Sequence, residues 1–424
     1  MDWRSSLLSA SAIAFVTLVM LATLVVCDGS AAYADPATGA ENADTLSAQP
    51  ADAPAAPAQS GDARSRPFVA NGIYDRPFMT SAGRTRFGGY AETNFRFERE
   101  DGVTEELSFL LPRLNLFAFA PVSERVRLAA EIEFEEGGEE ITIELAIIDL
   151  EIHDALTFRG GIILSPLGRF NVAHDSPANE LNDRPLVSTE LIGAALSEPG
   201  MGALGAFYPS SRARITYELY AVNGFDNGVL IGSEGGTRIA EGKGNFEDNN
   251  AHPSVVGRVA VSPMPALEVG MSAHAGPYNV YERDGLDVDE RRDVTIAALD
   301  WSASSGRFEL LGEAARTRID VPANLSGIVA SEQRGLYAEA SARFLEGAIA
   351  TLPSSRFAAV SRYDVVDFDE DLSGDSVQRV TTGVNFRPTS DTVFKLDYQY
   401  NWLRDRFNVE ARSAGIVFGV ATYF

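Results

Sequence analysis

Hydrophobic and polar residues alternate along most of the chain. The clearest stretch is "TVFKLDYQYNW", in which Phe394, Leu396 and Tyr398 occupy one side while Lys395 and Asp397 occupy the other. A helix would mix these two classes around its surface, whereas an extended strand separates them onto opposite faces. The stretches "VRLAAEIEFE" and "GLYAEASARF" repeat the pattern. The sequence therefore predicts an all-β protein.

The strands that this alternation predicts are long. Their apolar faces run for five or six positions, which suits a tilted strand crossing a bilayer better than a strand of a soluble β-sandwich or β-helix, the alternative fold. The opposite faces carry charges of both signs, as a wet interior would. About sixteen segments follow the pattern. They are 84–98, 106–120, 123–136, 139–152, 156–164, 200–208, 212–223, 254–263, 266–275, 293–303, 306–318, 333–345, 354–366, 376–387, 391–404 and 408–424.

The connections between these segments are sorted by length. Those after even-numbered segments are mostly tight, such as "PVSE", "HDA" and "PTS", while the three longest follow odd-numbered segments, at 165–199, 224–253 and 276–292. Outer-membrane barrels have short periplasmic turns, long external loops and an even strand count. The sequence therefore predicts a transmembrane antiparallel β-barrel over residues 83–424.

The amino terminus has the layout of an export signal. Arg4 precedes an apolar stretch from Leu7 to Cys27, and the small-residue site "AYA" ends at Ala34. This predicts a signal peptide over 1–34 that is cleaved on export, and a retained anchor or a lipoprotein modified at Cys27 are the alternatives. The following Ala-, Pro- and Asp-rich stretch has no periodic apolar face, so 35–82 is expected to be a disordered periplasmic linker.

The charge of the chain is strongly acidic. Sixty Asp and Glu residues oppose 35 Lys and Arg residues, giving −25 at pH 7, and such a field disfavours a nucleic-acid partner. The only lysines are Lys243 and Lys395, so arginine carries nearly all positive charge. The sole cysteine is Cys27, which excludes an intrachain disulfide.

A barrel of this size leaves a water-filled lumen, which predicts a passive diffusion channel for small hydrophilic solutes or ions. The loop at 165–199 is long and contains apolar residues, so we expect it to fold into the lumen and constrict it. Capping the outer mouth, or packing against neighbouring subunits, is the alternative. The apolar residues of the loop include Leu181, Leu186, Val187, Leu191 and Ile192.

Charged residues on the expected inward faces and in this loop are the candidates for the pore lining. They would set a transverse field that orients a solute, although ion pairs that only stiffen the wall give the same pattern. The candidates are Arg113, Arg125, Arg127, Glu131, Glu133, Arg159, Arg169, Asp183, Arg184, Arg258, Glu339, Arg343 and Arg379, with Arg362, Glu313, Asp397, His174, Asp175, Glu180 and Glu190 as further members.

Motifs for other chemistry are weak. The four histidines lack metal-ligand spacing, and in "DFDEDLSGD" Gly374 falls too late for an EF-hand, so no metal or cofactor is expected. No nucleophile motif is present, which predicts a protein that is not an enzyme. A structural or adhesive barrel with an occluded lumen, and a hydrolase built on the barrel wall, are the alternative functions.

The chain ends on the strand-like segment "SAGIVFGVATYF". Its alternate residues predict a lipid-facing edge that pairs with the first strand near 87–97, because an open barrel edge cannot exist in lipid. The ending also matches the signal by which the barrel assembly machinery recognises its substrates. The residues of that signal are Phe418, Val420 and Phe424.

Several stretches resemble the phosphate-selective porins O and P: "PRLNLFAFAPVSERVRLAAEIEF", "FRGGIILSPLGRF", "YELYAVNGFDNG", "SRYDVVDFD" and "TTGVNFRPTSDTVFKLDYQYNWLRD". The resemblance implies sixteen-stranded homotrimeric channels of a Gram-negative-type outer membrane, with the third loop folded inward. The chain departs from the family where Ile162, Ile163 and Leu164 replace a cationic residue, and in its scarcity of lysine. Residues after 66 still carry a formal net charge of −21, out of −25 for the whole chain. Phosphate selectivity therefore does not follow from the resemblance.

Overall fold

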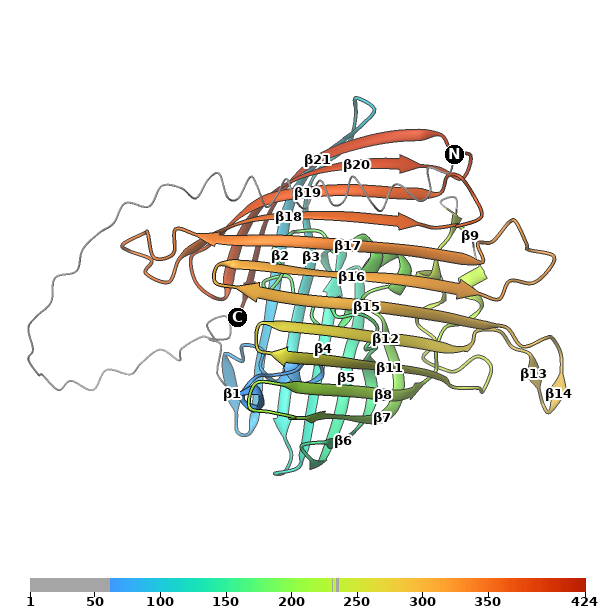
Figure 1. Cartoon of the computed structure of the whole chain (residues 1–424), viewed down its shortest axis with the longest axis horizontal. Helices are drawn as coiled ribbons and strands as arrows, with labels where there is room; N and C mark the ends of the chain where they lie inside the picture. Colours follow the sequence, from blue (N-terminus) through green and yellow to red (C-terminus); the bar gives the residue numbers. More distant parts are fainter. Residues whose placement is uncertain (1–61, 231, 234–235) are drawn as a thin grey trace, which may run out of the picture. The chain divides into compact units, whose positions relative to one another are not determined.

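A closed antiparallel barrel of sixteen long strands makes up most of the chain (Figure 1). The computed structural model describes residues 62–424 except 231, 234 and 235. The strands are β2 (Thr85–Glu100), β3 (Val103–Pro121), β4 (Val126–Glu135), β5 (Glu140–His153), β6 (Leu156–Leu164), β7 (Ser197–Phe207), β8 (Arg214–Val222), β11 (Ser254–Met264), β12 (Leu267–Pro277), β15 (Asp293–Ser305), β16 (Phe308–Ile319), β17 (Glu332–Phe344), β18 (Arg356–Asp367), β19 (Ser376–Arg387), β20 (Thr392–Arg404) and β21 (Glu410–Tyr423). The predicted fold class and strand number are confirmed.

The barrel closes where its last strand pairs with its first. Tyr423 faces Tyr90 and Phe418 faces Phe95 across the β21–β2 ladder. Beyond the ladder, Phe424 and Gly89 exchange two main-chain hydrogen bonds of 2.9 Å. The seam satisfies the main-chain groups that an open edge would leave exposed to lipid. The predicted pairing of the two ends of the sheet is therefore confirmed.

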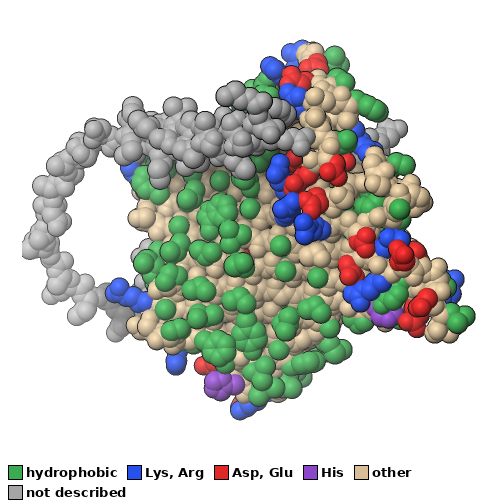
Figure 2. Space-filling view, turned by 45° about the vertical axis from the view of Figure 1, so that its right-hand side comes forward, with side chains coloured by type: hydrophobic (Ala, Val, Ile, Leu, Met, Phe, Trp, Pro, Cys, Tyr) green, Lys and Arg blue, Asp and Glu red, His purple; other side chains and the backbone are tan. Residues whose placement is uncertain are grey.

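The two faces of the sheet differ as the alternation predicts. On β20, Lys395 and Asp397 are fully buried inside the barrel, while Leu396 and Tyr398 are about half exposed on its outside. Figure 2 shows apolar side chains spread over the outer surface of the barrel wall. No helix within the described residues is long and apolar enough to span a membrane.

The loops are sorted by length as expected. The three longest are 165–196 between β6 and β7, 223–253 between β8 and β11, and 278–292 between β12 and β15. The first holds the short helices η5 (Phe170–Val172) and η6 (Val187–Ile192), and the second holds η7 (Asn227–Leu230), η8 (Ile239–Gly242) and the short strands β9 (Gly232–Ser233) and β10 (Gly236–Thr237). The third holds β13 (Glu282–Arg283) and β14 (Leu286–Asp287), and η4 (Glu136–Gly138) joins β4 to β5.

The segment before the barrel differs from the predicted linker. Residues 62–82 form η2 (Ala63–Ser65), η3 (Val69–Tyr74) and β1 (Thr80–Ala82), and β1 pairs with the start of β2. Phe68 is buried against the wall, because "RPFVANGIYDRPFM" supplies apolar side chains that the Ala- and Pro-rich stretch before it lacks. We call residues 62–79 the N-terminal strap. The predicted signal peptide and the linker before residue 62 lie outside the described residues.

Candidate functional site

The loop at 165–196, here called the third loop, lies within the barrel. Near its start, the Gly168 amide donates to Ser272 Oγ on β12 at 2.9 Å. Further along, the Asn182 amide donates to Asp397 Oδ2 on β20 at 2.7 Å. Between these points the Phe170 amide bonds to the Glu313 carboxylate on β16. The loop therefore contacts inward-facing side chains on well-separated strands.

Apolar packing fixes the second half of the third loop. Val187, Leu191 and Ile192 on η6 are fully buried in one cluster with wall residues such as Tyr337 on β17 and Val366 on β18. The 223–253 loop completes the cluster with Phe225, Val229 and Ile239. Burial of an aliphatic side chain contributes about 1.5–3 kcal/mol, so these residues hold the loop against the β15–β18 wall. This explains the apolar content that the sequence places in the loop.

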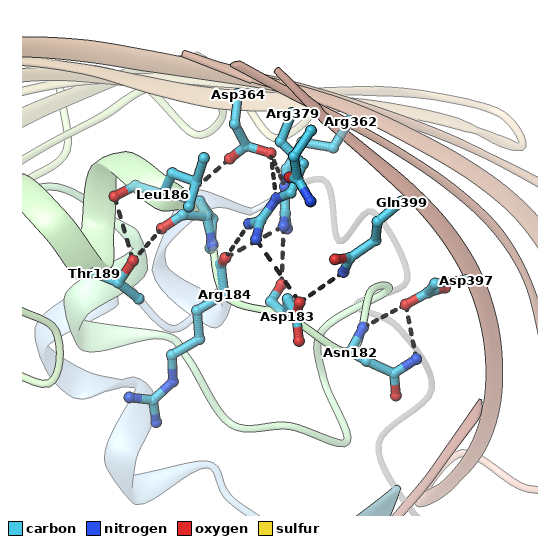
Figure 3. A network of polar contacts seen from close by, with 12 residues as sticks. Asn182, Asp183, Arg184, Leu186, Thr189, Arg362, Asp364, Arg379, Asp397 and Gln399 are labelled. Atoms are coloured by element: carbon cyan, nitrogen blue, oxygen red, sulfur yellow. Dashed lines mark hydrogen bonds and ion pairs between the residues drawn. The ribbon is translucent and has the colours of Figure 1, made fainter. Parts of the chain in front are cut away.

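A polar network joins the middle of the third loop to β18, β19 and β20, as Figure 3 shows. Arg362 donates to the Asp183 carbonyl at 2.9 Å and to Asp364 Oδ2 at 2.9 Å. Gln399 donates to Asp183 Oδ2 at 2.6 Å, and Arg379 Nη1 lies 3.7 Å from the same oxygen. The network gives buried charges on the wall and in the loop partners of opposite sign or hydrogen-bond partners, which offsets part of the cost of burying them.

Asp183 also pairs across the seam with Arg96 on β2, whose Nη1 donates to Asp183 Oδ2 at 3.1 Å. Burial alone would raise the pKa of Asp183, but the Arg96 hydrogen bond and charge, assisted by Arg379, hold that pKa well below its ordinary 3.8. Asp183 is therefore an ionised carboxylate held between the guanidinium groups of Arg96 and Arg379.

Lys395 on β20 holds the third loop through its main chain. Its ammonium group donates to the carbonyls of Ser176 and Leu181 at 2.9 and 3.0 Å.

A second network lies beside β3, β4 and β5. Arg76 of the strap bonds to Glu131 on β4, and its Nη2 donates to Asp175 of the third loop at 2.7 Å. Asn115 on β3 donates to Glu131 at 2.7 Å and to Glu144 on β5 at 2.9 Å. Wall, strap and loop therefore meet at one buried group of charges.

His174 lies at the edge of this second network. Its Nδ1 lies 2.9 Å from the Asn171 carbonyl and must donate to it, so in the neutral ring Nε2 carries no proton and faces the Glu144 carboxyl group. Burial, reinforced by the charge of Arg184, lowers the pKa of His174 to about 4. His174 is accordingly a neutral hydrogen-bonding group at neutral pH.

A third network follows β8, β11, β12 and β15. Arg258 makes two hydrogen bonds to Asp300, at 2.6 and 3.0 Å. Glu268 on β12 accepts from Arg169 of the third loop at 2.9 Å and from Arg214 on β8 at 3.2 Å. The loop is thus tied to the lumen wall by ion pairs on this side as well.

Most of the predicted lining residues lie on the inner faces of the strands or in the third loop. The wall group comprises Arg113, Arg127, Glu131, Glu133, Arg159, Arg258, Glu339, Arg343 and Arg379, and the loop group comprises Arg169, Asp183 and Arg184. Arg125 does not join them. It is exposed in the turn before β4 and donates to the Ile152 carbonyl at 3.1 Å, because β4 begins at Val126, three residues after the start of the predicted segment 123–136.

Sequence reasoning missed the strap and two wall arginines. Tyr74 of the strap donates to Asp149 at 2.7 Å, and burial followed by the charge of Asp149 raises the pKa of Tyr74 above its ordinary 10. On the wall, Arg356 faces Arg387 across the β18–β19 ladder. The alternation around Arg356 and Arg387 could have identified both, whereas no periodic signal marks the strap.

Nothing in the described part of the chain groups three or more His, Cys, Asp or Glu residues in a way that could hold a metal ion. The geometry instead offers a polar interior in which arginine and carboxylate side chains alternate. Such an interior can bind and orient charged or hydrogen-bonding solutes when water enters it.

No family model matches the chain. A protein of Aquifex aeolicus (strain VF5) described only as "Uncharacterized protein" is 23% identical over 353 residues, which cover 78% of each chain. Among solved structures, the outer membrane channel DcaP of Acinetobacter baumannii has a TM-score of 0.53 at 10% identity, covering 82% of this chain and 99% of that one. Salmonella typhi OmpF in complex with daunomycin scores 0.51 at 12% identity (80% and 98% covered), and Pseudomonas putida OprB scores 0.51 at 10% identity (80% and 94% covered). The chain therefore has the fold of outer-membrane porins.

Proposed function

We propose that the protein is an outer-membrane porin through which small hydrophilic solutes or ions diffuse passively. The observation that carries the proposal is the opposite character of the two faces of the sheet. Paired charges such as Arg258 and Asp300 line the inside, while apolar side chains such as Leu396 and Met271 cover the outside. A polar interior enclosed by an apolar exterior suits an aqueous path through lipid.

The third loop would constrict this path. Its contacts with β12, β16 and β20 support a position across the lumen, and its charged residues Arg169, Asp183 and Arg184 would act on a passing solute. Because both signs of charge meet there, we expect weak selectivity rather than a preference for phosphate. The shortage of lysine and the acidic barrel support the same expectation.

The proposal includes a cellular setting. An apolar outer surface needs lipid, so we place the barrel in the outer membrane of a Gram-negative-type bacterium, delivered by a cleaved signal peptide over 1–34 and inserted by the barrel assembly machinery. A homotrimer is part of the proposal, as the resemblance to porins O and P implies.

Burial of the wall charges favours a second candidate, a structural or adhesive barrel with an occluded lumen. Glu131, Asp149 and Glu313 are fully buried behind the strap and the third loop. Planar-bilayer recordings of the purified, folded protein separate the two. Stepwise currents that reverse with an ion gradient support the porin, and persistent silence both from the folded protein and from a folded variant without strap residues 63–78 would favour the occluded barrel.

A further inference from the structure

The N-terminal strap runs along the inside of one half of the barrel. It enters at the turn side, where the Ala63 amide bonds to the Ser211 carbonyl at 2.5 Å and Arg66 donates to the Pro265 carbonyl at 2.9 Å. It leaves where the Met79 amide bonds to the Phe87 carbonyl at 2.9 Å, just before β1 pairs with β2. Main-chain bonds therefore join the strap to the barrel at its two ends.

Side chains hold the middle of the strap. Phe68, Ala70 and Ile73 are buried in one apolar cluster with Leu145 and Ile147 of β5. Around this cluster lie wall charges that an open lumen would present to water, and the strap covers them. Asp149 accepts from Tyr74 at 2.7 Å, and Arg159 donates to the Ala70 carbonyl at 3.0 Å.

Arg76 is the contact that ties the strap to the third loop. Its guanidinium bonds Glu131 on the wall and Asp175 in the loop, and its side chain is 9% exposed. Removing one partner of a buried charge group leaves the others unpaired, which is far costlier than losing a surface pair. Without Arg76, the carboxylates of Glu131 and Asp175 would face each other in a buried site. Arg76 is therefore the charged link between the strap and the third loop, beside the apolar packing of Val172 against the strap cluster.

We propose that the strap is a gate of the lumen, closed in this structure and latched by Arg76, and that its displacement uncovers the charged wall of β4–β8 as an aqueous path. The proposal rests on the channel function proposed above. It is compatible with the sheet remaining intact, since the ladder contains no strap residue between Phe68 and Phe78. The strap precedes the first barrel strand, so it can leave the lumen without breaking the barrel.

The test compares Arg76→Ala with Arg84→Ala in the full-length protein. Arg84 is a matched control because it is exposed in the turn between β1 and β2. Each variant also carries Cys27→Ser and Ile73→Cys, so that the rate of labelling by a water-soluble maleimide reports whether the strap has left the wall. Bilayer conductance of the same preparations, checked for folding by heat-modifiable gel mobility, reports whether the lumen has opened.

Relative to the parent that carries only Cys27→Ser and Ile73→Cys, we expect Arg76→Ala to raise both the labelling rate and the fraction of time that the channel is open by about tenfold or more. Arg84→Ala should change neither quantity. A variant lacking residues 63–78 should conduct continuously, which covers the case in which Arg76→Ala folds poorly. Faster labelling without a change in conductance, or equal conductance of the wild-type and deleted proteins, would overturn the gate while leaving the channel function intact. If neither the wild type nor any variant conducts, although Arg76→Ala is labelled faster, the proposed channel function itself is wrong.

Discussion

Arg76 and Asp175 join two parts of the chain that the sheet does not hold together, with Arg76 Nη2 lying 2.7 Å from Asp175 Oδ1. The third loop is fixed on one side by Asp183 and its neighbours on β18–β20, and on the other side by this contact with the strap. The interior of the barrel is therefore organised by charges from three sources: wall, loop and strap.

Arg159→Ala should destabilise the folded barrel by about 3 to 5 kcal/mol, because it leaves Asp149 as a buried carboxylate without its bidentate partner. Arg159 makes two 2.8 Å hydrogen bonds to Asp149, and both side chains are almost fully buried. Urea titration in lipid vesicles, followed by tryptophan fluorescence, measures the effect. Arg125→Ala is the control, and its exposed position should keep the change within about 0.5 kcal/mol. Equal midpoints for the two variants would show that the Asp149 pair does not stabilise the barrel.

His174 should make the barrel less stable as the pH falls. Its pKa is about 4 in the folded protein and 6.5 when unperturbed. Above pH 6.5 both folded and unfolded states hold a neutral imidazole, so its contribution is constant there. Between pH 6.5 and 4 only the unfolded state takes up the proton, and up to about 3 kcal/mol of stability is lost.

The His174→Gln variant isolates this effect, since glutamine keeps a polar side chain that does not titrate. Asp175 acts in the opposite direction to His174. Burial raises the pKa of Asp175 in the folded state, so protonation of Asp175 adds stability to the folded state as the pH falls. The difference between wild type and variant at each pH cancels the Asp175 contribution to first order. Urea titrations at pH 7.5, 5.5 and 4.5 measure the free energy of unfolding of both proteins. The excess stability of the wild type over His174→Gln should shrink as the pH falls, and a difference independent of pH would show that His174 does not have a lowered pKa in the folded protein.

Arg356→Ala should shift ion selectivity toward cations, by about twofold in the permeability ratio. Within the described part of the chain, Arg356 makes no ion pair, and it is half-buried on the inner face of β18. Its charge therefore acts on the lumen rather than on a fixed partner. Reversal potentials under a salt gradient measure the ratio. Arg316→Ala is the control, because Arg316 is exposed on the outer face and pairs with Glu332. An unchanged reversal potential in Arg356→Ala would place the selective charges elsewhere.

The barrel could be predicted from sequence because each strand repeats the same local alternation of apolar and polar residues. All sixteen segments are found, and the bounds of β6 and β19 coincide with the predicted ones. The partners inside the lumen could not be predicted, because pairs such as Asp183 with Arg362 join residues far apart in the chain. The strap was missed for a different reason. Its apolar residues, such as Phe68 and Ile73, follow neither strand nor helix periodicity, and they pack only once the wall exists.

The carboxyl terminus yields a prediction about assembly. Phe424 closes the seam against Gly89. A Cβ atom added to Gly89 would lie 2.9 Å from the Phe424 ring and 2.2 Å from the Asn115 carbonyl oxygen, so the seam has no room for a side chain at this position. Charged residues added after Phe424 would have to follow this tight seam, and they would also alter the terminal signal predicted from Phe418, Val420 and Phe424.

Adding three charged residues after Phe424 should therefore lower the amount of folded protein in the outer membrane by about tenfold. Heat-modifiable gel mobility of membrane fractions measures this amount. An extension of three Gly and Ser residues separates the effect of charge from that of length, and we expect it to cause a smaller loss. Gly89→Ala should mimic the charged extension without altering the terminus, because the added methyl group displaces Phe424 from the seam. Normal yields of the charged variant would show that neither the seam nor the signal depends on a chain ending at this residue.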